Sequence, residues 1–589
     1  MLKIKQLYTQ ILLTVVSLFV AITLVNCNGS GFEVADSCFN DGGDPLFSYA
    51  WHLANCGQKV FAKNGGTVGM DLNLRATWSS GLRGNGVKVR ISDDGLDNVH
   101  EDLTGNFQTV VARSRDYISG DSNNSYKTTT AVPRDVVVGG TPYNDDHGTA
   151  VAGIVAAVAG NGKGGRGVAP KAALSIANFM SALTSTAESV LLNQADGNDF
   201  DISNMSWGIK QYQKTAVSAN YEAQLKTGVT TFRNGRGAIY IKSGGNSYYE
   251  QCNGQPNDVC LGNSNFDGEN VNPYQIMVGA LTAQGYSANY SSPGANLWIS
   301  GFGGMYGDSA PAILTTDRTG CVRGRSATNA GSSIAFENGG SGNSGCNYSV
   351  TFNGTSSAAP TVTGAVALLL EANPNLTWRD VKYILAKTAL AVDYVTTGSI
   401  PYPGGTTANR GVPAGYSWEL PWRVNGAGFK FQNWYGFGKV DIDAAVAMAK
   451  SYTSTFGTYT ESTWISTGTI NVAIPDNSLA NAALSEIQIL SGGNGALKIE
   501  AVRVRVSITH NDISQLALEL TSPSGMRSIL VNMNNSLLNV HDYSADVFLS
   551  NAFYGERSEG TWTLKVIDGH GDAVSGTLTN WQLQIIGAP

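Results

Sequence analysis

A serine at the start of an apolar helix is the feature that most constrains this chain. Residues 354–360 read Gly-Thr-Ser-Ser-Ala-Ala-Pro and are followed by a run of small and apolar residues. This pattern predicts a buried helix whose free N–H groups and positive dipole end lie beside Ser356. Pro360 is expected in the first turn, where its missing N–H costs nothing. Ser356 could be an ordinary helix cap, or a nucleophile if a base lies near it.

Two upstream strings supply the other groups that such a nucleophile needs. Residues 145–153 read Asp-Asp-His-Gly-Thr-Ala-Val-Ala-Gly, and His147 opens a helical run that stops near Gly160. Residues 87–95 read Val-Lys-Val-Arg-Ile-Ser-Asp-Asp-Gly, whose alternating apolar residues predict a strand ending at two aspartates. A serine hydroxyl needs a base, which histidine provides near neutral pH, and a buried carboxylate orients the imidazole. The three strings therefore predict an Asp-His-Ser triad.

The triad strings and two flanking motifs resemble one branch of a known superfamily. Residues 93–97 read Asp-Asp-Gly-Leu-Asp, and residues 371–380 read Glu-Ala-Asn-Pro-Asn-Leu-Thr-Trp-Arg-Asp. With the chain order Asp, His, Ser, the sequence resembles subtilisin-superfamily serine proteases of the kexin/furin branch over roughly residues 44–589. The resemblance implies an α/β catalytic domain, with a mostly parallel sheet and helices on both faces, and an exported endopeptidase that works through an acyl-enzyme.

The resemblance also assigns catalytic roles. Asp93, the first aspartate of the pair, is the triad carboxylate, His147 is the base and Ser356 is the nucleophile. Asn246 is the side-chain donor to the oxyanion, although the stretch 243–246, Ser-Gly-Gly-Asn, has one glycine more than kexins show. A catalytically silent binding protein on the same scaffold is the alternative from another functional class.

Specificity is predicted from the residues that resemble the substrate cleft. The edge Ser206-Trp207-Gly208 would pair with substrate backbone as an added strand. Asp94 matches an acid that faces the second substrate residue, and Asp267 matches an acid of the specificity pocket. A further family acid is missing after Gly208. We expect cleavage after Arg or Lys, less strict than in furin; the alternative is that Asp267 is a turn residue and specificity is broad.

A calcium site is implied by the same resemblance. Hard oxygen ligands suit Ca²⁺, and the matching positions are two carboxylates, one amide and three backbone carbonyls. The expected ligands are Asp44, Asp102 and Asn161, with the carbonyls of Val158, Lys163 and Gly165.

The N-terminus predicts export. A short basic region precedes an apolar run of signal-peptide length that ends in Leu-Val-Asn-Cys, which resembles a bacterial lipobox. Residues 1–27 are therefore expected to be a signal peptide, with lipidation of Cys27 as a membrane anchor; ordinary cleavage to a secreted enzyme is the alternative. Six further cysteines remain in an exported chain, and their clustering suggests the pairs Cys38–Cys56, Cys252–Cys260 and Cys321–Cys346.

The C-terminal part carries a different pattern. After about residue 457, apolar residues alternate in runs such as 502–508 and 516–520, which predicts an antiparallel β-sandwich. This part, residues 457–589, resembles the P domain of proprotein convertases, which packs on and stabilises the catalytic domain (residues 28–456). With 14% charged residues and a net charge of −7, the chain is not expected to bind nucleic acid.

One departure from the family concerns folding. The family carries a long N-terminal prodomain, for which there is no room between Cys27 and Asp44. We expect either a separate chaperone or inhibitor protein as a partner, or unaided folding. Protein or peptide substrates are the other expected partners.

Overall fold

The computed structural model describes most of the chain beyond its N-terminal segment. The described residues are 43–107, 114–117, 126–127, 133, 135–138, 141–180, 199–248, 250–251, 259–328, 330–393, 415–417 and 420–589. The predictions for the signal peptide, Cys27, Cys38 and Cys252 fall outside these residues. Residues 41–589 form one compact unit.

The catalytic part is built on an eight-stranded sheet in the order β12-β11-β8-β7-β1-β6-β2-β3. Every neighbouring pair is parallel except β2 and β3 at one edge. The strands are β1 (Lys88–Asp93), β2 (Arg115–Tyr117), β3 (Tyr126–Lys127), β6 (Ala173–Asn178), β7 (Ile202–Met205), β8 (Ile239–Ser243), β11 (Gln275–Leu281) and β12 (Ile299–Phe302). This confirms the expected mostly parallel sheet.

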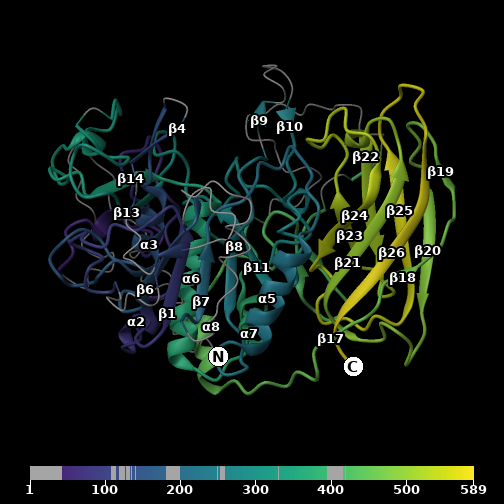
Figure 1. Ribbon diagram of the computed structural model, residues 1–589, viewed down its shortest axis with the longest axis horizontal. Coiled ribbons are helices and arrows are strands. Elements are labelled where there is room, and N and C mark those ends of the chain that lie inside the picture. Colours follow the sequence, from purple (N-terminus) through teal and green to yellow (C-terminus); the bar gives the residue numbers. More distant parts are fainter. Residues whose placement is uncertain are drawn as a thin grey trace, which may run out of the picture. The chain divides into compact units, whose positions relative to one another are not determined.

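Helices cover both faces of this sheet. Helices α3 and α6 pack against each other and against the central strands (Figure 1). On the other face, α5 approaches β8 so closely that a Cβ on Gly228 would clash with the hydroxyl of Tyr240. The helices are α2 (Arg75–Ser79), α3 (His147–Ala156), α5 (Ala219–Thr231), α6 (Thr355–Ala372), α7 (Trp378–Thr388) and α8 (Ile442–Ser451), with short 3₁₀ turns at Phe47–Tyr49, Ser264–Phe266, Ala335–Asn338 and Ile513–Gln515.

Helix α6 corrects one expectation. Because it begins at Thr355, Pro360 is its sixth residue and lies in the second turn. A proline there cannot donate to the carbonyl four residues earlier, which is that of Ser356. The hydroxyl of Ser206 donates to this carbonyl instead, at 2.9 Å. The proline therefore frees a backbone acceptor that ties the Ser206 strand end to the predicted nucleophile.

Short two-stranded ribbons surround the sheet. They are β4 (Asp135–Val138) with β5 (Thr141–Asn144), β9 (Glu250–Gln251) with β10 (Val259–Cys260), β13 (Ile313–Thr316) with β14 (Tyr348–Phe352), and β15 (Arg423–Val424) with β16 (Lys430–Phe431). Cys321 and Cys346 form the expected disulfide, with their Cα atoms 5.0 Å apart. Cys56 is also disulfide-bonded, and the prediction that its partner is Cys38 stays a prediction, as does the pair Cys252–Cys260.

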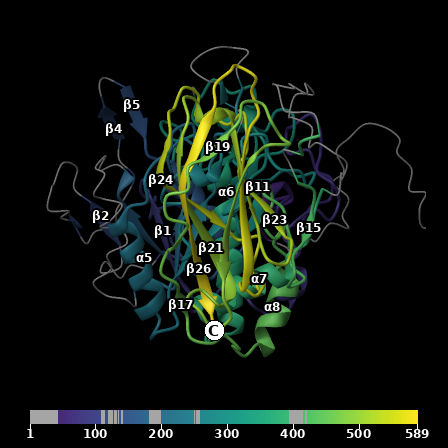
Figure 2. The ribbon, with the colours of Figure 1, turned by 90° about the vertical axis from the view of Figure 1, so that its right-hand side faces the viewer.

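The C-terminal part is an antiparallel β-sandwich, as its alternating pattern predicted. One sheet runs β17-β26-β21-β24, with β18 and β19 also paired to β26, and the other runs β20-β25-β22-β23 (Figures 1 and 2). The strands are β17 (Thr460–Glu461), β18 (Ile465–Ser466), β19 (Val472–Ile474), β20 (Ala483–Ile489), β21 (Lys498–Thr509), β22 (Leu516–Thr521), β23 (Arg527–Val531), β24 (Tyr543–Ser550), β25 (Gly560–Asp568) and β26 (Gly576–Ala588).

Polar contacts join the sandwich to the catalytic part. The guanidinium of Arg503 on β21 pairs with Glu222 on α5 at 2.6 Å, and Arg379 on α7 pairs with Glu500 at 2.5 Å. Both arginines are largely buried, so each pair is shielded from solvent and would be costly to break. Within the described residues, no helix is long and apolar enough to cross a membrane.

Candidate active site

The three predicted triad residues lie on three elements that pack together near the carboxyl end of the central strand β1. Asp93 ends β1, His147 begins α3 and Ser356 lies in the first turn of α6. Nδ1 of His147 lies 2.8 Å from Oδ1 of Asp93, which is fully buried. Because Nδ1 is engaged, Nε2 is the ring atom left to accept a proton, and among the described residues it has no hydrogen-bond partner of its own.

The environment of His147 suits a base. Burial by itself lowers the pKa of the imidazole, but the charge of Asp93 and its hydrogen bond outweigh burial, so the pKa of His147 lies above its usual value. The hydroxyl of Ser356 donates to the backbone carbonyl of Ser206 at 3.3 Å. Catalytic hydrogen bonds are often long or poorly aligned before substrate binds. The imidazole of His147 packs against Phe352, four residues before Ser356, with the ring centres 5.4 Å apart.

Asn246 completes the expected set. Its Oδ1 accepts hydrogen bonds from the backbone N–H and the hydroxyl of Thr355, at 2.8 and 2.7 Å. This fixes the amide so that Nδ2 faces the start of α6. A Cβ built on Gly354 would lie 3.1 Å from Nδ2 and 3.5 Å from the backbone nitrogen of Ser356. Two nitrogens that carry N–H groups therefore lie near one another at the start of α6, and an oxyanion needs such a pair of donors.

The additional glycine before Asn246 has a steric reason. Gly245 adopts a φ of +112°, and a Cβ there would lie 2.3 Å from the amide of Gln211. Only glycine fits this position. The stretch Ser-Gly-Gly-Asn thus places Asn246 against Thr355, which supports the assignment that the sequence left open.

Comparison with known proteins agrees with this geometry. Residues 84–438 match the model of the subtilase family, and residues 499–585 match that of the proprotein convertase P-domain. The chain belongs to the subtilase family. It is a serine protease of the branch that carries a P domain, as its motifs predicted.

Similar proteins cover nearly the whole chain. An extracellular serine protease of Aeromonas sobria is 33% identical, over 90% of this chain and 84% of its own length. A dibasic-processing endoprotease of Schizosaccharomyces pombe is 29% identical, over 92% of this chain and 65% of its own length. The crystal structure of the Aeromonas sobria serine protease in complex with a chaperone matches with a TM-score of 0.81 and 30% identity, covering 93% of this chain and 96% of that one.

Asp94 lies beside the triad of this subtilase but is turned toward helix α3. Its carboxylate accepts the backbone N–H groups of His147 at 3.2 Å and Gly148 at 2.7 Å. Burial, and then the neighbouring Asp93, raise the pKa of Asp94 well above its usual value. Asp94 therefore holds the N-terminus of α3 in place, and its predicted contact with the second substrate residue stays a prediction.

The predicted specificity acid is buried and partnered. Asp267 follows the 3₁₀ turn Ser264–Phe266 and accepts the backbone N–H of Ile209 at 3.3 Å. Nζ of Lys242 lies 3.7 Å from the same carboxylate oxygen. A Cβ on the exposed Gly208 would lie 3.1 Å from Oδ2 of Asp267 and 3.2 Å from Nζ of Lys242. The acid and the lysine thus lie together directly behind the predicted substrate strand, residues 206–208.

Sequence reasoning missed Lys242. The signal was present, because residues 239–243 read Ile-Tyr-Ile-Lys-Ser, and a lysine in an otherwise apolar strand of a buried parallel sheet requires a partner. Gln211, which follows Gly208 closely in sequence, is buried, and its Oε1 accepts the hydroxyl of Ser292 at 3.1 Å.

The expected calcium ligands converge in part. The side-chain amide of Asn161 donates to Oδ1 of Asp102 at 2.7 Å, while Oδ2 of Asp102 is buried without a hydrogen-bond partner. Burial raises the pKa of Asp102 to about 7, to which nearby Asp44 contributes. Asp44 is also paired with Arg166, at 2.6 Å. Hard oxygens and an unpartnered buried carboxylate oxygen fit Ca²⁺.

This calcium site would be poor in acids. Among the described residues there is no cluster of three or more His, Cys, Asp or Glu side chains that could hold a metal. The predicted site therefore depends on two carboxylates, the amide of Asn161 and the carbonyls of Val158, Lys163 and Gly165.

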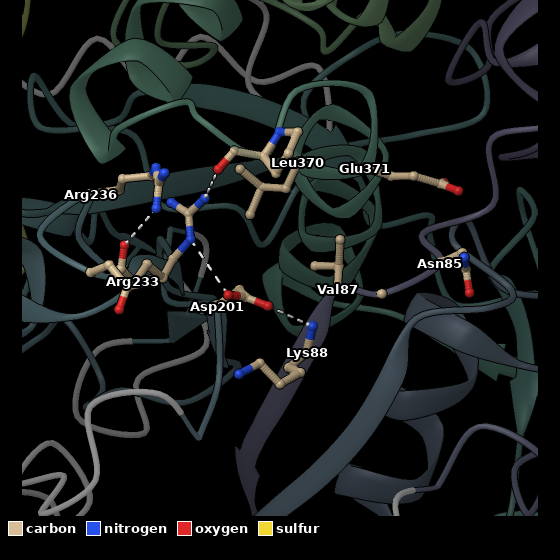
Figure 3. A pocket seen from close by; sticks show the side chains of 11 residues that line it. Asn85, Val87, Lys88, Asp201, Arg233, Arg236, Leu370 and Glu371 are labelled. Carbon is tan, nitrogen blue, oxygen red and sulfur yellow. Dashed lines mark hydrogen bonds and ion pairs between the residues drawn. The ribbon is translucent and has the colours of Figure 1, made fainter.

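A cavity of about 470 Å³ lies at the opposite end of β1 from Asp93 (Figure 3). Its charged groups satisfy one another. Asp201 accepts the backbone N–H of Lys88 and pairs with Arg233 at 3.5 Å. Arg233 also donates to the carbonyls of Gly237 and Leu376. These bonds hold together the loops at the amino ends of the strands, whereas parallel sheets usually bind ligands at the carboxyl ends.

Proposed function

We propose that this subtilase is an exported, calcium-binding serine endopeptidase that acts through an acyl-enzyme. The observation that carries the proposal is the hydrogen bond between Asp93 and His147. It is supported by Asn246, whose amide Oδ1 is fixed by Thr355, next to Ser356.

The geometry suits the following reaction. Nε2 of His147 takes the proton of the Ser356 hydroxyl as Oγ attacks the scissile carbonyl carbon. The oxyanion that forms is held by Asn246 and the backbone N–H of Ser356. On collapse the C–N bond breaks, and the leaving amine receives the proton from His147. Water, activated by the same imidazole, then hydrolyses the ester and regenerates Ser356. Asp93 keeps Nδ1 protonated throughout.

Labelling with a fluorophosphonate probe tests the proposal. The wild type should label, and Ser356→Ala should abolish labelling and lower kcat by about 10⁶-fold. Ser357→Ala is the matched control, because its hydroxyl donates only to the carbonyls of Gly303 and Gly354; this variant should still label. Folded wild type that does not label would overturn the proposal and favour a silent binding protein.

For specificity we propose cleavage after Arg or Lys with a relaxed preference. Asp267 lies buried behind Gly208, which supports an acid at the base of the pocket. One relative is named a dibasic-processing endoprotease. The absence of the further family acid expected after Gly208 supports a relaxed preference rather than a strict one. Broad specificity, with Asp267 as a turn residue, is the alternative that peptide profiling would reveal.

Calcium would act on stability and not in the reaction. Binding to Asp44, Asp102 and Asn161 would neutralise a buried carboxylate and fasten the loop after α3 to the segment before the first strand. EDTA should therefore lower the Tm of the wild type by several degrees. In Asp102→Asn, EDTA should no longer lower the Tm. An equal drop in Tm of the wild type and of Asp102→Asn would contradict the proposed calcium site.

Export, lipidation of Cys27 and a folding partner complete the proposal. An Aeromonas sobria relative is named extracellular, and a related crystal structure contains a chaperone. We infer that this protease too is assisted by a separate chaperone. Full activity of the chain expressed alone would contradict the inference that it needs a separate chaperone. Mass spectrometry of the N-terminal peptide would distinguish a lipidated Cys27 from ordinary cleavage.

A further inference from the structure

Lys242 is a fully buried cation behind the predicted substrate strand. Its Nζ donates to the carbonyl of Trp207 at 2.8 Å and lies 4.6 Å from the centre of the Trp207 ring. It is 3.7 Å from Asp267 and 3.9 Å from Glu269. The lysine therefore has fixed partners on three sides, and two of them are acids.

We propose that Lys242 is a specificity-determining residue: it serves as an internal counter-ion for Asp267 and weakens the preference for a basic substrate residue before the cut. This inference depends on the proposed endopeptidase function and names what sets its substrate class. A substrate Arg or Lys would have to share Asp267 with a cation that is already in place.

The charges support this competition. A carboxylate held by a single substrate guanidinium in a buried pocket is a strong, directional contact. Because Nζ of Lys242 lies close to the same carboxylate oxygen, an incoming cation meets a like charge at short range. Water and salt screen this repulsion little, because the groups are buried. Lys242, Asp267 and Glu269 together carry one net negative charge. A basic substrate side chain is therefore still accepted, but its advantage over a neutral one is smaller than it would be without Lys242.

The position of Lys242 makes it hard for the lysine to move aside. It lies on β8, whose backbone is fixed by β7 and β11 on either side. Side chains alternate across a strand, so Lys242 shares its face with Tyr240, which α5 covers. The side chain is fully buried in this position, and we expect it to remain at Asp267 while substrate binds.

The test compares two fluorogenic peptides that differ only in Arg or Met before the cut. In Lys242→Met, which keeps the length of the side chain without its charge, the Arg/Met ratio of kcat/KM should rise by about tenfold or more. Adding Asp267→Asn should remove that gain. Lys242→Gln, whose amide can still donate to the Trp207 carbonyl, should show the same direction and serves if the methionine variant does not fold.

Lys382 offers a matched control. It is also buried, donates to a backbone carbonyl (Pro273, 2.7 Å) and lies 4.0 Å from the centre of a tryptophan ring (Trp298). Lys382→Met should leave the Arg/Met ratio unchanged. Fluorophosphonate labelling counts active sites in every variant and separates a failure of the proposed function from a failure of this inference. A ratio that stays within twofold, or falls, in labelled Lys242→Met or Lys242→Gln would overturn the inference.

Discussion

The triad and the pair Asp267–Lys242, which we propose as the wall of the specificity pocket, are built in different ways. Asp93, His147 and Ser356 come from three elements of the catalytic part: His147 bonds Asp93 directly, and Ser356 bonds the carbonyl of Ser206. Asp267 ends a segment that the sandwich also holds: Nδ2 of Asn265 donates to the carbonyl of Leu549 and Oδ1 accepts its N–H, at 3.2 and 2.9 Å.

The difference separates two kinds of constraint. Proton transfer and oxyanion binding tolerate only one arrangement of donors and acceptors, so the triad region matches its family. A pocket wall has only to complement a side chain. In the wall that we propose, Lys242 lies beside Asp267, and the acid expected after Gly208 is absent. Variants of the triad should therefore change rates without changing selectivity, whereas variants of the wall should do the reverse.

The largest effect is expected from Asp93→Asn. Without the carboxylate, the imidazole of His147 loses its fixed tautomer, and kcat should fall by about 10⁴-fold. The Arg/Met ratio should not change. Steady-state kinetics with the two peptides measure both quantities, and a changed ratio would mean that triad and pocket are not separable.

A smaller loss is expected from Asn246→Ala. The variant keeps the nucleophile but removes one oxyanion donor, which should lower kcat by about 10²–10³-fold with KM little changed. Thr355→Ser keeps the hydroxyl that orients Asn246 and serves as a control with near wild-type kcat. A rise in KM alone would place Asn246 in substrate binding instead.

The pH profile tests the environment of the base. The pKa of His147 is raised, and the imidazole must be neutral to act, so kcat/KM should fall as pH drops through a value above the usual 6.5. The acid limb should shift to lower pH in Asp93→Asn, because the charge that raises the pKa is gone. An acid limb below 6.5 in the wild type would show that burial outweighs Asp93.

The smallest effect on rate is expected at the junction with the sandwich. Asn265→Ala would leave the N–H and carbonyl of Leu549 without their partner, at a cost of about 1–3 kcal/mol in unfolding free energy. It should also alter the Arg/Met ratio a few-fold while labelling persists. Asn425→Ala, which loses similar bonds to the carbonyls of Ala552 and Tyr554, should lower Tm without altering the ratio.

Local sequence patterns predicted much of this molecule. Alternating residues marked β1 and the sandwich strands. The position of Pro360 was wrong by one turn, because a proline pattern alone does not tell where a helix begins. Asp94 is placed under α3 by two backbone N–H groups that no local pattern reveals.

By itself, the sequence determined the chemistry: an aspartate at a strand end and a histidine and a serine at helix starts, in one chain order. Motifs of this kind are local, because they depend on backbone geometry within a few residues. Only the tertiary structure decided what surrounds Asp267, since Lys242 reaches it from another strand of the sheet, and Leu549 of the sandwich holds Asn265 in the turn just before it. A carboxylate's role depends on the charges around it, and those are set by folding.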